Sequence, residues 1–216
     1  MFTGIVQDIG TVSGVRKVGG GIHISVRAPE SARELKVDDS VSVNGVCQTV
    51  IQKRGSVFTL EAVEETLSKT TLGALAVSSQ VNLELPVRLN DRLGGHLVQG
   101  HVDCVGTIGS VEKKASSWLI TVHFPEEFNR YVIPVGSIAI DGISLTIAFT
   151  TPGTLTVSII PHTLEKTTLG SAHVGAKVNL EFDLVGKYIE KMVQGEKTEE
   201  ERKSSLTEEK LKGWGY

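Results

Sequence analysis

The sequence predicts an all-β protein of two duplicated domains in tandem, followed by a C-terminal α-helix. Three observations lead to this fold class: the chain repeats itself over nearly half its length, short segments of alternating polarity dominate each copy, and a helical pattern appears only after the second copy. A length of 216 residues is enough for two small domains that each bury a core.

The repeat is visible in several pairs of segments. "VSVNGVCQTVI" from Val41 matches "IAIDGISLTIA" from Ile138, a shift of 138 − 41 = 97 residues. "ETLSKTTLG" from Glu65 matches "HTLEKTTLG" from His162, at 162 − 65 = 97, and "VNLEL" recurs as "VNLEF". Near the start of the chain the shift is one residue smaller, so "MFTGIV" lies over "LVQGHV". A repeat this long is a duplicated domain rather than a solenoid unit, because each copy can bury its own core.

The repeat also predicts the domain boundaries. Residues 1–94 form the first domain, residues 95–186 the second, and residues 187–216 a helical tail. The linker is expected near "VRLNDRLGGH", where two glycines stand at positions 94 and 95.

Within each copy the pattern is that of β-strands. In "GIHISVRA", Ile22, Ile24 and Val26 share one face and polar residues share the other; "WLITVHF" and "KVNLEFD" alternate in the same way. Glycine and proline interrupt these segments at short intervals, and no long amphipathic helix separates them. Two small antiparallel barrels or sandwiches are therefore expected.

The tail has a different pattern. "KYIEKMV" places Ile189, Met192 and Val193 on one helical stripe, which predicts a helix with a packing partner. That partner is either its own barrel or another copy of the chain. Residues 196–203 are almost all charged and are expected to be solvated, and residues 205–208 form a candidate capping box for a last short helix.

Composition excludes several classes of protein. A net charge of −3 and 5% aromatic residues argue against a nucleic-acid partner. The longest apolar region, near residues 131–149, is broken by proline, glycine and aspartate, so no membrane span is expected. The N-terminus lacks the basic and apolar segments of a secretory signal, and Cys47 and Cys104 have no close partner. A cytosolic protein with reduced thiols is expected.

The most informative polar residues lie on strands. Cys47 and Thr49 share one strand face in the first copy, and Ser144 and Thr146 occupy the equivalent face in the second. Taken singly, such residues are usually satisfied hydroxyls or filler. The duplication keeps the polar pair and changes its first member from thiol to hydroxyl, which favours two related pockets with divided roles. Asp141, next to the second pair, is interpreted as a turn former.

Other motifs have simpler explanations. His96 and His101 are five residues apart, on opposite faces of a strand, so a metal pair is not expected. His101 and Asp103 could share a face as a base and its orienting acid, although a surface hydrogen bond is the commoner arrangement. "KTTLG" is typical of a turn. No dinucleotide fingerprint, phosphate loop or serine elbow is present.

Together these motifs resemble riboflavin synthase of the trimeric alpha-subunit type. The resemblance covers both repeats and the tail, through "MFTGIV", "NGVCQTV", "GGHLVQGHVD", "IDGISLT" and "IPHTLEKTTLG". It implies two tandem Greek-key β-barrels followed by a helix. It also implies a transferase that catalyses a dismutation, the last step of riboflavin biosynthesis. Two molecules of 6,7-dimethyl-8-ribityllumazine exchange a four-carbon unit and give riboflavin and 5-amino-6-ribitylamino-uracil, with no metal or organic cofactor.

The resemblance further implies a homotrimer. Two copies of one compound must be held face to face, and such positioning supplies much of the rate enhancement. In the family, the N-terminal barrel of one subunit meets the C-terminal barrel of its neighbour. The trimer contact is made by helices after the second barrel, here from about Lys187.

Carried over by position, the resemblance places one lumazine site in each barrel. The N-terminal site comprises Gly4, Ile5, Val6, Cys47, Gln48, Thr49, Glu61, Ala62, Val63, Glu64, Glu65 and Thr66. The C-terminal site comprises Gly100, His101, Val102, Ser144, Leu145, Thr146, Ile160, Pro161, His162, Thr163, Leu164 and Glu165.

Four of these residues are hypothesised to be catalytic. Cys47 would activate one lumazine by adding to its ring or placing a water there. His101 or a nearby hydroxyl would relay the proton of the acidic C7 methyl of the other lumazine, and Ser144 and Thr146 would hydrogen-bond its carbanion. Many relatives have a lysine where this chain has Val135, which puts a charged substrate contact there in doubt.

Three rival functions compete with this interpretation. A lumazine protein has the same double barrel and binds the ligand without chemistry; the combination of the four candidate catalytic residues favours the enzyme. A flavin-binding barrel of an oxidoreductase would need a nicotinamide domain, for which the chain has no room. A nucleic-acid-binding barrel is opposed by the charge and the few aromatic residues.

Overall fold

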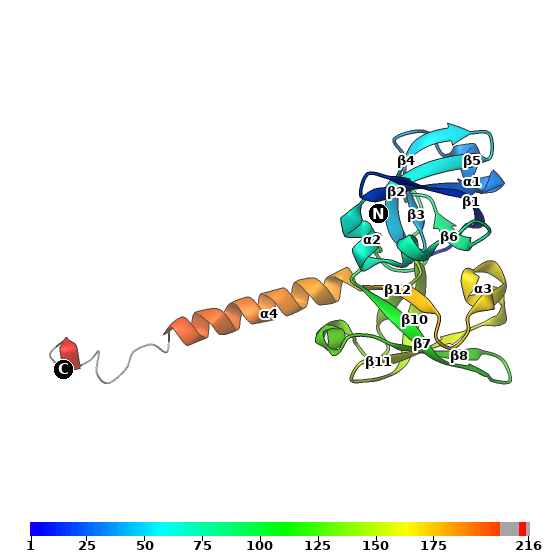
Figure 1. Cartoon of the computed structure of the whole chain (residues 1–216). Coiled ribbons are helices and arrows are strands. Elements are labelled where there is room, and N and C mark those ends of the chain that lie inside the picture. Colours follow the sequence, from blue (N-terminus) through cyan, green and yellow to red (C-terminus); the bar gives the residue numbers. More distant parts are fainter. Residues whose placement is uncertain (204–211, 215–216) are drawn as a thin grey trace.

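Two closed antiparallel β-barrels, each of six strands, form most of the molecule (Figure 1). The computed structural model describes the backbone of residues 1–203 and 212–214, and the side chains of residues 1–193 and 212–214. The candidate capping box at residues 205–208 lies outside the described residues. The prediction of an all-β fold with two tandem barrels and a following helix is confirmed.

The two barrels have the same topology. The first contains β1 (Asp8–Val18), β2 (Gly21–Arg27), β3 (Ser40–Val43), β4 (Val46–Arg54), β5 (Val57–Ala62) and β6 (Gln80–Glu84). The second contains β7 (Cys104–Lys113), β8 (Trp118–His123), β9 (Ser137–Ile140), β10 (Ile143–Thr151), β11 (Thr154–Ile159) and β12 (Lys177–Phe182). In each barrel the second strand pairs with the fifth instead of the third, a non-consecutive pairing of the Greek-key kind.

Short helices close the barrels between strands. The first barrel has α1 (Pro29–Glu34), α2 (Glu64–Lys69) and the 3₁₀ helix η1 (Thr71–Ala74). The second has η2 (Glu126–Tyr131), α3 (Pro161–Lys166) and η3 (Thr168–Ser171).

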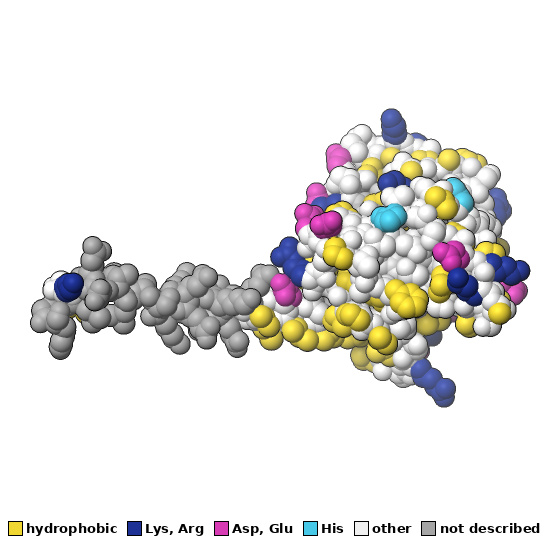
Figure 2. Space-filling view, turned by 90° about the horizontal axis from the view of Figure 1, so that it is seen from below, with side chains coloured by type: hydrophobic (Ala, Val, Ile, Leu, Met, Phe, Trp, Pro, Cys, Tyr) yellow, Lys and Arg dark blue, Asp and Glu magenta, His cyan; other side chains and the backbone are white. Residues whose placement is uncertain are grey.

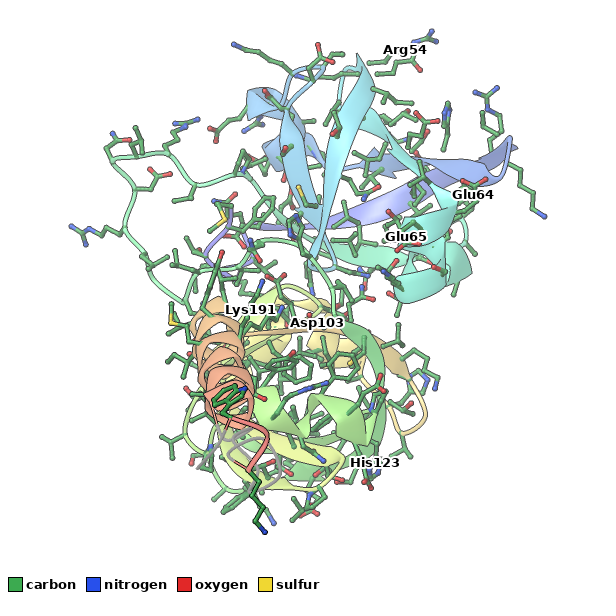
Figure 3. All side chains as sticks on the ribbon, turned by 90° about the vertical axis from the view of Figure 1, so that its left-hand side faces the viewer. Arg54, Glu64, Glu65, Asp103, His123 and Lys191 are labelled. Carbon is green, nitrogen blue, oxygen red and sulfur yellow. The ribbon has the colours of Figure 1, made fainter. Side chains whose placement is uncertain are left out.

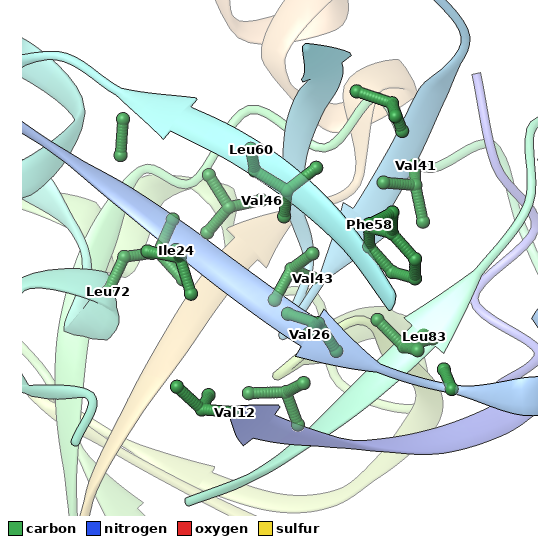
Figure 4. Close-up of a cluster of buried hydrophobic side chains, with 14 of the residues drawn as sticks. Val12, Ile24, Val26, Val41, Val43, Val46, Phe58, Leu60, Leu72 and Leu83 are labelled. Atoms are coloured by element: carbon green, nitrogen blue, oxygen red, sulfur yellow. The ribbon is translucent and has the colours of Figure 1, made fainter. Parts of the chain in front are cut away.

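Each barrel has its own apolar core, built from the inward faces of its strands. On β2, Ile22, Ile24 and Val26 are buried as the alternation predicts, and Phe58 and Leu60 on the neighbouring strand β5 meet them (Figure 4). Full burial of such a side chain is worth roughly 1.5–3 kcal/mol. Two separate cores explain why the repeat length equals one whole barrel.

Two asparagines from the repeated "VNLE" motif join the barrels. Asn82 donates from Nδ2 to the carbonyl of Asp141 and accepts from the Thr168 amide, at 3.0 and 2.8 Å. Asn179 does the same in the opposite direction, to the Asn44 carbonyl and from the Thr71 amide, both at 2.8 Å. The "KTTLG" turns therefore serve as partners of the opposite barrel, and the reciprocal contacts describe an approximate two-fold axis between the copies.

The equivalent turns at Asn44 and Asp141 lie against each other, since a Cβ atom at Gly45 would lie 2.6 Å from the Gly142 nitrogen. Both residues have positive φ angles, 47° and 46°, which asparagine and aspartate tolerate best among residues with a side chain. Asn44 Oδ1 accepts from the Asn82 amide, and Asp141 Oδ1 accepts from the Asn179 amide, both at 2.8 Å. The interpretation of Asp141 as a turn former is confirmed. Burial raises the pKa of Asp141 to about 7.

Helix α4 (Leu184–Lys203) projects away from both barrels (Figure 1). It begins three residues before Lys187, the expected start, and its first turns lie against η2. The predicted stripe of Ile189, Met192 and Val193 is exposed. Figure 2 shows apolar side chains gathered where α4 leaves the second barrel. Of the two packing partners expected for this stripe, its own barrel does not cover it.

Among the helices that the structure describes, none combines the length and the apolar character needed to cross a membrane.

Candidate functional site

The segment that precedes each barrel packs against the other barrel. Phe2 and Val98 form a β-bridge between the two segments. Beyond it, Val6 packs against the core of the second barrel, and Val102 packs against the core of the first. The repeated sequences "MFTGIV" and "LVQGHV" are thus exchanged between the copies.

Two backbone hydrogen bonds fix this exchange. The Ser144 amide donates to the Gly4 carbonyl at 2.7 Å, and the Cys47 amide donates to the Gly100 carbonyl at 2.9 Å. Both glycines have positive φ angles, 77° and 82°. A Cβ atom at Gly4 would lie 2.6 Å from the Ser144 Cβ, and one at Gly100 would lie 2.6 Å from the Cys47 Cβ. Only glycine both adopts a positive φ angle without strain and leaves room for the neighbouring Cβ atom.

The exchange corrects one part of the sequence prediction. Residues 4–6 were grouped with Cys47, and residues 100–102 with Ser144, because each segment was assigned to the barrel that follows it. The structure brings residues 4–6 to Ser144 and residues 100–102 to Cys47. We call the resulting groups the Cys47 half-site, with residues 47–49, 61–66 and 100–102, and the Ser144 half-site, with residues 144–146, 160–165 and 4–6.

In the Cys47 half-site, β4 presents alternate residues to the outside. Cys47 is half-buried and Thr49 is exposed, while Gln48 points inward and donates from Nε2 to the Cys47 carbonyl at 2.7 Å. Residues 61–66 cover the end of β5, which pairs with β4, and the start of α2, where Glu64 and Glu65 project outward (Figure 3). The half-site therefore faces outward.

The Ser144 half-site repeats this construction on β10. Ser144 is half-buried and Thr146 is exposed, while Leu145 packs against the second core. Residues 160–165 cover the turn after β11 and most of α3. A surface pocket of about 500 Å³ is lined by residues that include Val6, His162 and Glu165, so the exchanged segment and α3 form one surface.

His96 contacts the Ser144 hydroxyl, a feature that the sequence prediction missed. The His96 Nδ1 atom lies 2.7 Å from Ser144 Oγ, and the His96 amide donates to the Thr3 carbonyl at 3.1 Å. Only 8% of His96 is exposed, and burial lowers the pKa of its imidazole against the opposing effect of Asp183. The Nε2 atom is buried and has no hydrogen-bond partner among the described residues. Burial therefore favours the neutral form of this imidazole.

His101 and Asp103 do not form a base–acid pair, the less common of the two arrangements that their spacing allowed. The Asp103 carboxylate accepts from the Phe182 amide at 2.8 Å and pairs with Lys187 Nζ at 2.6 Å, at the start of α4. Figure 3 shows Asp103 near the start of this helix. His101 is exposed, and within residues 1–193 its ring has no hydrogen-bond partner. Asp103 anchors the helix instead of orienting His101.

Val135 lies in a turn beside the Ser144 half-site. Its side chain is 77% exposed and its φ angle is 62°, a rare conformation for a β-branched residue. The next residues enter β9, where Ser137 pairs with Thr146. The Gly136 carbonyl, next along the chain, accepts from the Ile147 amide at 2.9 Å, so this turn lies beside the strand that contains Thr146.

Comparison with protein families gives two matches along the chain. The lumazine binding domain model matches residues 3–86 and again residues 99–183, so it covers both barrels and the exchanged segments.

Solved structures with the same fold include LumP. The chain superposes on LumP complexed with riboflavin with a TM-score of 0.79 at 23% identity, covering 84% of this chain and 99% of that one. LumP complexed with 6,7-dimethyl-8-(1'-D-ribityl) lumazine gives a TM-score of 0.77 at 22% identity, with the same coverage. At this level of identity, the likeness shows the shared fold.

Full-length relatives are more similar in sequence. Riboflavin synthase of Actinobacillus pleuropneumoniae is 41% identical over 216 residues, 100% of both chains. Riboflavin synthase of Mycobacterium tuberculosis is 42% identical over 198 residues, 90% of this chain and 98% of the relative. That of Bacillus subtilis is 36% identical over 189 residues, 88% of each. With both lumazine binding domains present and the whole length matched, the chain belongs to the riboflavin synthase family.

Proposed function

We propose that the chain converts two molecules of 6,7-dimethyl-8-ribityllumazine into riboflavin and 5-amino-6-ribitylamino-uracil. The observation that carries the proposal is a pair of half-sites with the same construction and a different polar group at one position, Cys47 in one and Ser144 in the other. A dismutation needs two molecules of one compound in unlike roles. Two similar surfaces with different chemistry meet that need.

In the Ser144 half-site, His96 is placed to assist proton removal. The C7 methyl of the bound lumazine is acidic because its carbanion delocalises into the ring. Ser144 Oγ would take this proton as its own hydroxyl proton passes to His96 Nδ1, which lies 2.7 Å away and belongs to a neutral imidazole. Thr146, exposed on the same strand face, would hydrogen-bond the carbanion.

In the Cys47 half-site, the thiol is the candidate to activate the second lumazine. Cys47 is partly exposed and therefore accessible to a bound ring, where it would add or place a water. Cys104 is buried in the second core, where burial raises its pKa to about 12, so it is not a nucleophile. His101 lies on the same side as Cys47 and would reach a lumazine held opposite this half-site.

We also propose a homotrimer, in which half-sites of neighbouring chains face each other. Thr49 and Thr146 are both exposed, so a single half-site leaves one face of its ligand open to water. Pairing the Cys47 half-site of one chain with the Ser144 half-site of the next would exclude that water and stack the two lumazines. The exposed apolar stripe of α4, with Ile189, Met192 and Val193, supplies a surface for the contact.

A cytosolic location is part of the same proposal. Both cysteines are free thiols, which is the usual state in a reducing compartment.

The second candidate function is a carrier that binds a lumazine and leaves it unchanged. It is favoured by the structural likeness to LumP, whose solved complexes contain riboflavin and the ribityl lumazine. The contact between His96 and Ser144 supports the enzyme instead, since a carrier has no need of a hydroxyl bonded to a neutral, buried imidazole.

One experiment separates the two functions. The purified protein is mixed with 6,7-dimethyl-8-ribityllumazine alone, and the products are analysed by chromatography. Riboflavin and the pyrimidine in equal amounts support the enzyme, whereas unchanged lumazine in a stable complex supports the carrier. If Ser144→Ala and His101→Gln both left turnover untouched, the proposed residue roles would be wrong.

A further inference from the structure

Two buried glutamates outside the half-sites hold the exchanged segments. Glu84 at the end of β6 and Glu181 in β12 are equivalent in the repeat, and they are only 4% and 3% exposed. Each carboxylate accepts hydrogen bonds from successive backbone amides, and the charge of Lys187 also acts on Glu181.

Glu84 binds the first segment. Its Oε1 atom accepts from the Thr3 amide at 2.6 Å and from Thr3 Oγ1 at 2.8 Å, and its Oε2 atom accepts from the Gly4 amide at 3.0 Å. The carbonyl of the same Gly4 accepts from the Ser144 amide. Gly4 therefore links the carboxylate of the first barrel to the half-site of the second.

Glu181 binds the second segment in the same way. Its carboxylate accepts from the amides of Gln99, Gly100 and His101 at 2.7, 2.9 and 3.0 Å. The Gly100 carbonyl accepts from the Cys47 amide. Gly100 thus links the carboxylate of the second barrel to the half-site of the first.

We propose that Glu84 and Glu181 are positioning residues that act across the barrel boundary. Glu181, in the second barrel, fixes the backbone of residues 99–101 in the Cys47 half-site. Glu84, in the first barrel, fixes residues 3–4 in the Ser144 half-site. The inference rests on the proposed function only in taking the half-sites as the lumazine-binding surfaces.

A carboxylate is needed because every group that is hydrogen-bonded to it in the described residues is a donor. Hydrogen bonds from amides to a carboxylate are stronger than neutral ones, and a carboxylate has acceptor sites for all of them. A glutamine would turn an NH₂ group toward an amide donor and leave that amide unpaired. Glu→Gln therefore removes the function of the side chain while conserving its size.

The test uses Cys47 as a reporter of its own half-site. Native protein carrying Glu181→Gln or Glu84→Gln is treated with iodoacetamide, without ligand and then with riboflavin, and labelling of Cys47 is followed by mass spectrometry. Buried Cys104 serves as the internal control for unfolding. Glu112→Gln and Glu30→Gln are matched controls, because both glutamates are exposed and lie in the second and first domain respectively.

The proposal predicts that labelling of Cys47, in the first barrel, depends on Glu181 of the second barrel and not on Glu84 of its own barrel. Glu181→Gln should speed ligand-free labelling of Cys47 about tenfold, the effect expected from losing one charge-assisted hydrogen bond, and should weaken its protection by riboflavin. Glu84→Gln and both controls should label as the parent does. Equal effects of Glu84→Gln and Glu181→Gln, or no effect of either, would overturn the proposal.

Two further results keep the outcomes distinct. If riboflavin fails to protect Cys47 in the parent, the proposed binding function fails, while the ligand-free rates still decide the positioning role. If Glu181→Gln does not fold, hydrogen exchange of the parent decides: the amides of Gly4, Gly100 and His101 should exchange slowly although they lie outside any strand. Exchange at the rate of an open loop would overturn the inference.

Discussion

The Nδ1 atom of His96 lies 2.7 Å from the hydroxyl oxygen of Ser144, in a setting where His96 is almost fully buried. The two residues come from different parts of the fold: His96 from the segment between the barrels, and Ser144 from β10. Gly95 makes the approach possible, because a Cβ atom at that position would collide with the Thr3 carbonyl and would lie 2.8 Å from the Ser144 Cβ.

The first prediction is that this contact is needed for turnover. His96→Gln and Ser144→Ala should each lower kcat about 100-fold, the usual size of a general acid–base contribution, with a smaller change in KM. Steady-state formation of riboflavin measures both constants. His173→Gln is the matched control, because His173 is exposed and, among the described residues, its ring contacts the nearby Ser171 carbonyl alone. A parental kcat in His96→Gln would contradict the role.

The second prediction concerns the pH dependence of kcat. Burial lowers the pKa of His96 although Asp183 opposes the shift, so the neutral imidazole persists to a lower pH than in an ordinary histidine. Turnover should therefore fall only at pH values below the usual imidazole range, as His96 gains a proton and no longer accepts one from Ser144. A pH–rate profile checks this, and His96→Gln should lack that acid limb. If kcat of His96→Gln still falls at low pH as in the parent, another titrating group causes that fall.

The sequence predicted the two barrels and the outward polar pairs because both follow from the repeat and from strand alternation. It could not predict which barrel each leading segment joins. A segment packed on its own barrel and one packed on the other obey the same repeat shift, and only the contacts of Gly4 and Gly100 distinguish them. His96 was missed for a related reason. The repeat shift near the start of the chain is 96 residues, so position 96 has no matching residue in the given sequence that could have drawn attention to it.

The partner of Asp103 could not be predicted from the sequence for a different physical reason. Strand alternation places Asp103 near His101, but the nearest cation comes from the tail, which has no equivalent in the first copy. Lys187 on α4 forms an ion pair with the Asp103 carboxylate. A pattern confined to one strand contains no information about a helix that begins about eighty residues later.

A third prediction is that Asp141→Asn stabilises the protein above neutral pH. The pKa of Asp141 is raised from 3.8 to about 7 by burial, so folding favours its protonated form. The stability that this form contributes is present below about pH 4 and is lost as the pH rises to about 7. Asparagine cannot ionise, and Asn44 occupies the equivalent turn.

Urea unfolding at pH 5 and pH 8 measures this effect. The gain from Asp141→Asn should be larger at pH 8 and of the order of 2–4 kcal/mol, as expected for a shift of about three pKa units. Asp38→Asn is the control, because Asp38 is exposed and also has a positive φ angle. An equal gain at both pH values would show that ionisation of Asp141 is not the cause.

A fourth prediction is that Val135→Asn stabilises the fold by about 1 kcal/mol, since asparagine tolerates a positive φ angle much better than a β-branched residue does. Because the side chain is 77% exposed, little packing is lost. Thermal or urea unfolding provides the measurement. Val135→Lys, tested for lumazine affinity, then reports whether a charge at this position reaches the Ser144 half-site. Tighter binding by Val135→Lys with no change in Val135→Asn would identify the charged contact.

The last prediction tests whether catalysis depends on a neighbouring chain. Met192→Asp places a charge on the exposed apolar stripe of α4, eight residues after Leu184, where the helix begins, so the fold of each barrel should be retained. Buried in a contact between chains, that charge would be costly, and sedimentation velocity should show the proposed trimer shifting to monomer. Lys191→Ala, beside it on the same helix and exposed, should leave the mass unchanged.

Because each half-site is open on one side, the monomer should still bind riboflavin while losing turnover. A monomeric variant with full activity would mean that the two half-sites of one chain complete the reaction between themselves.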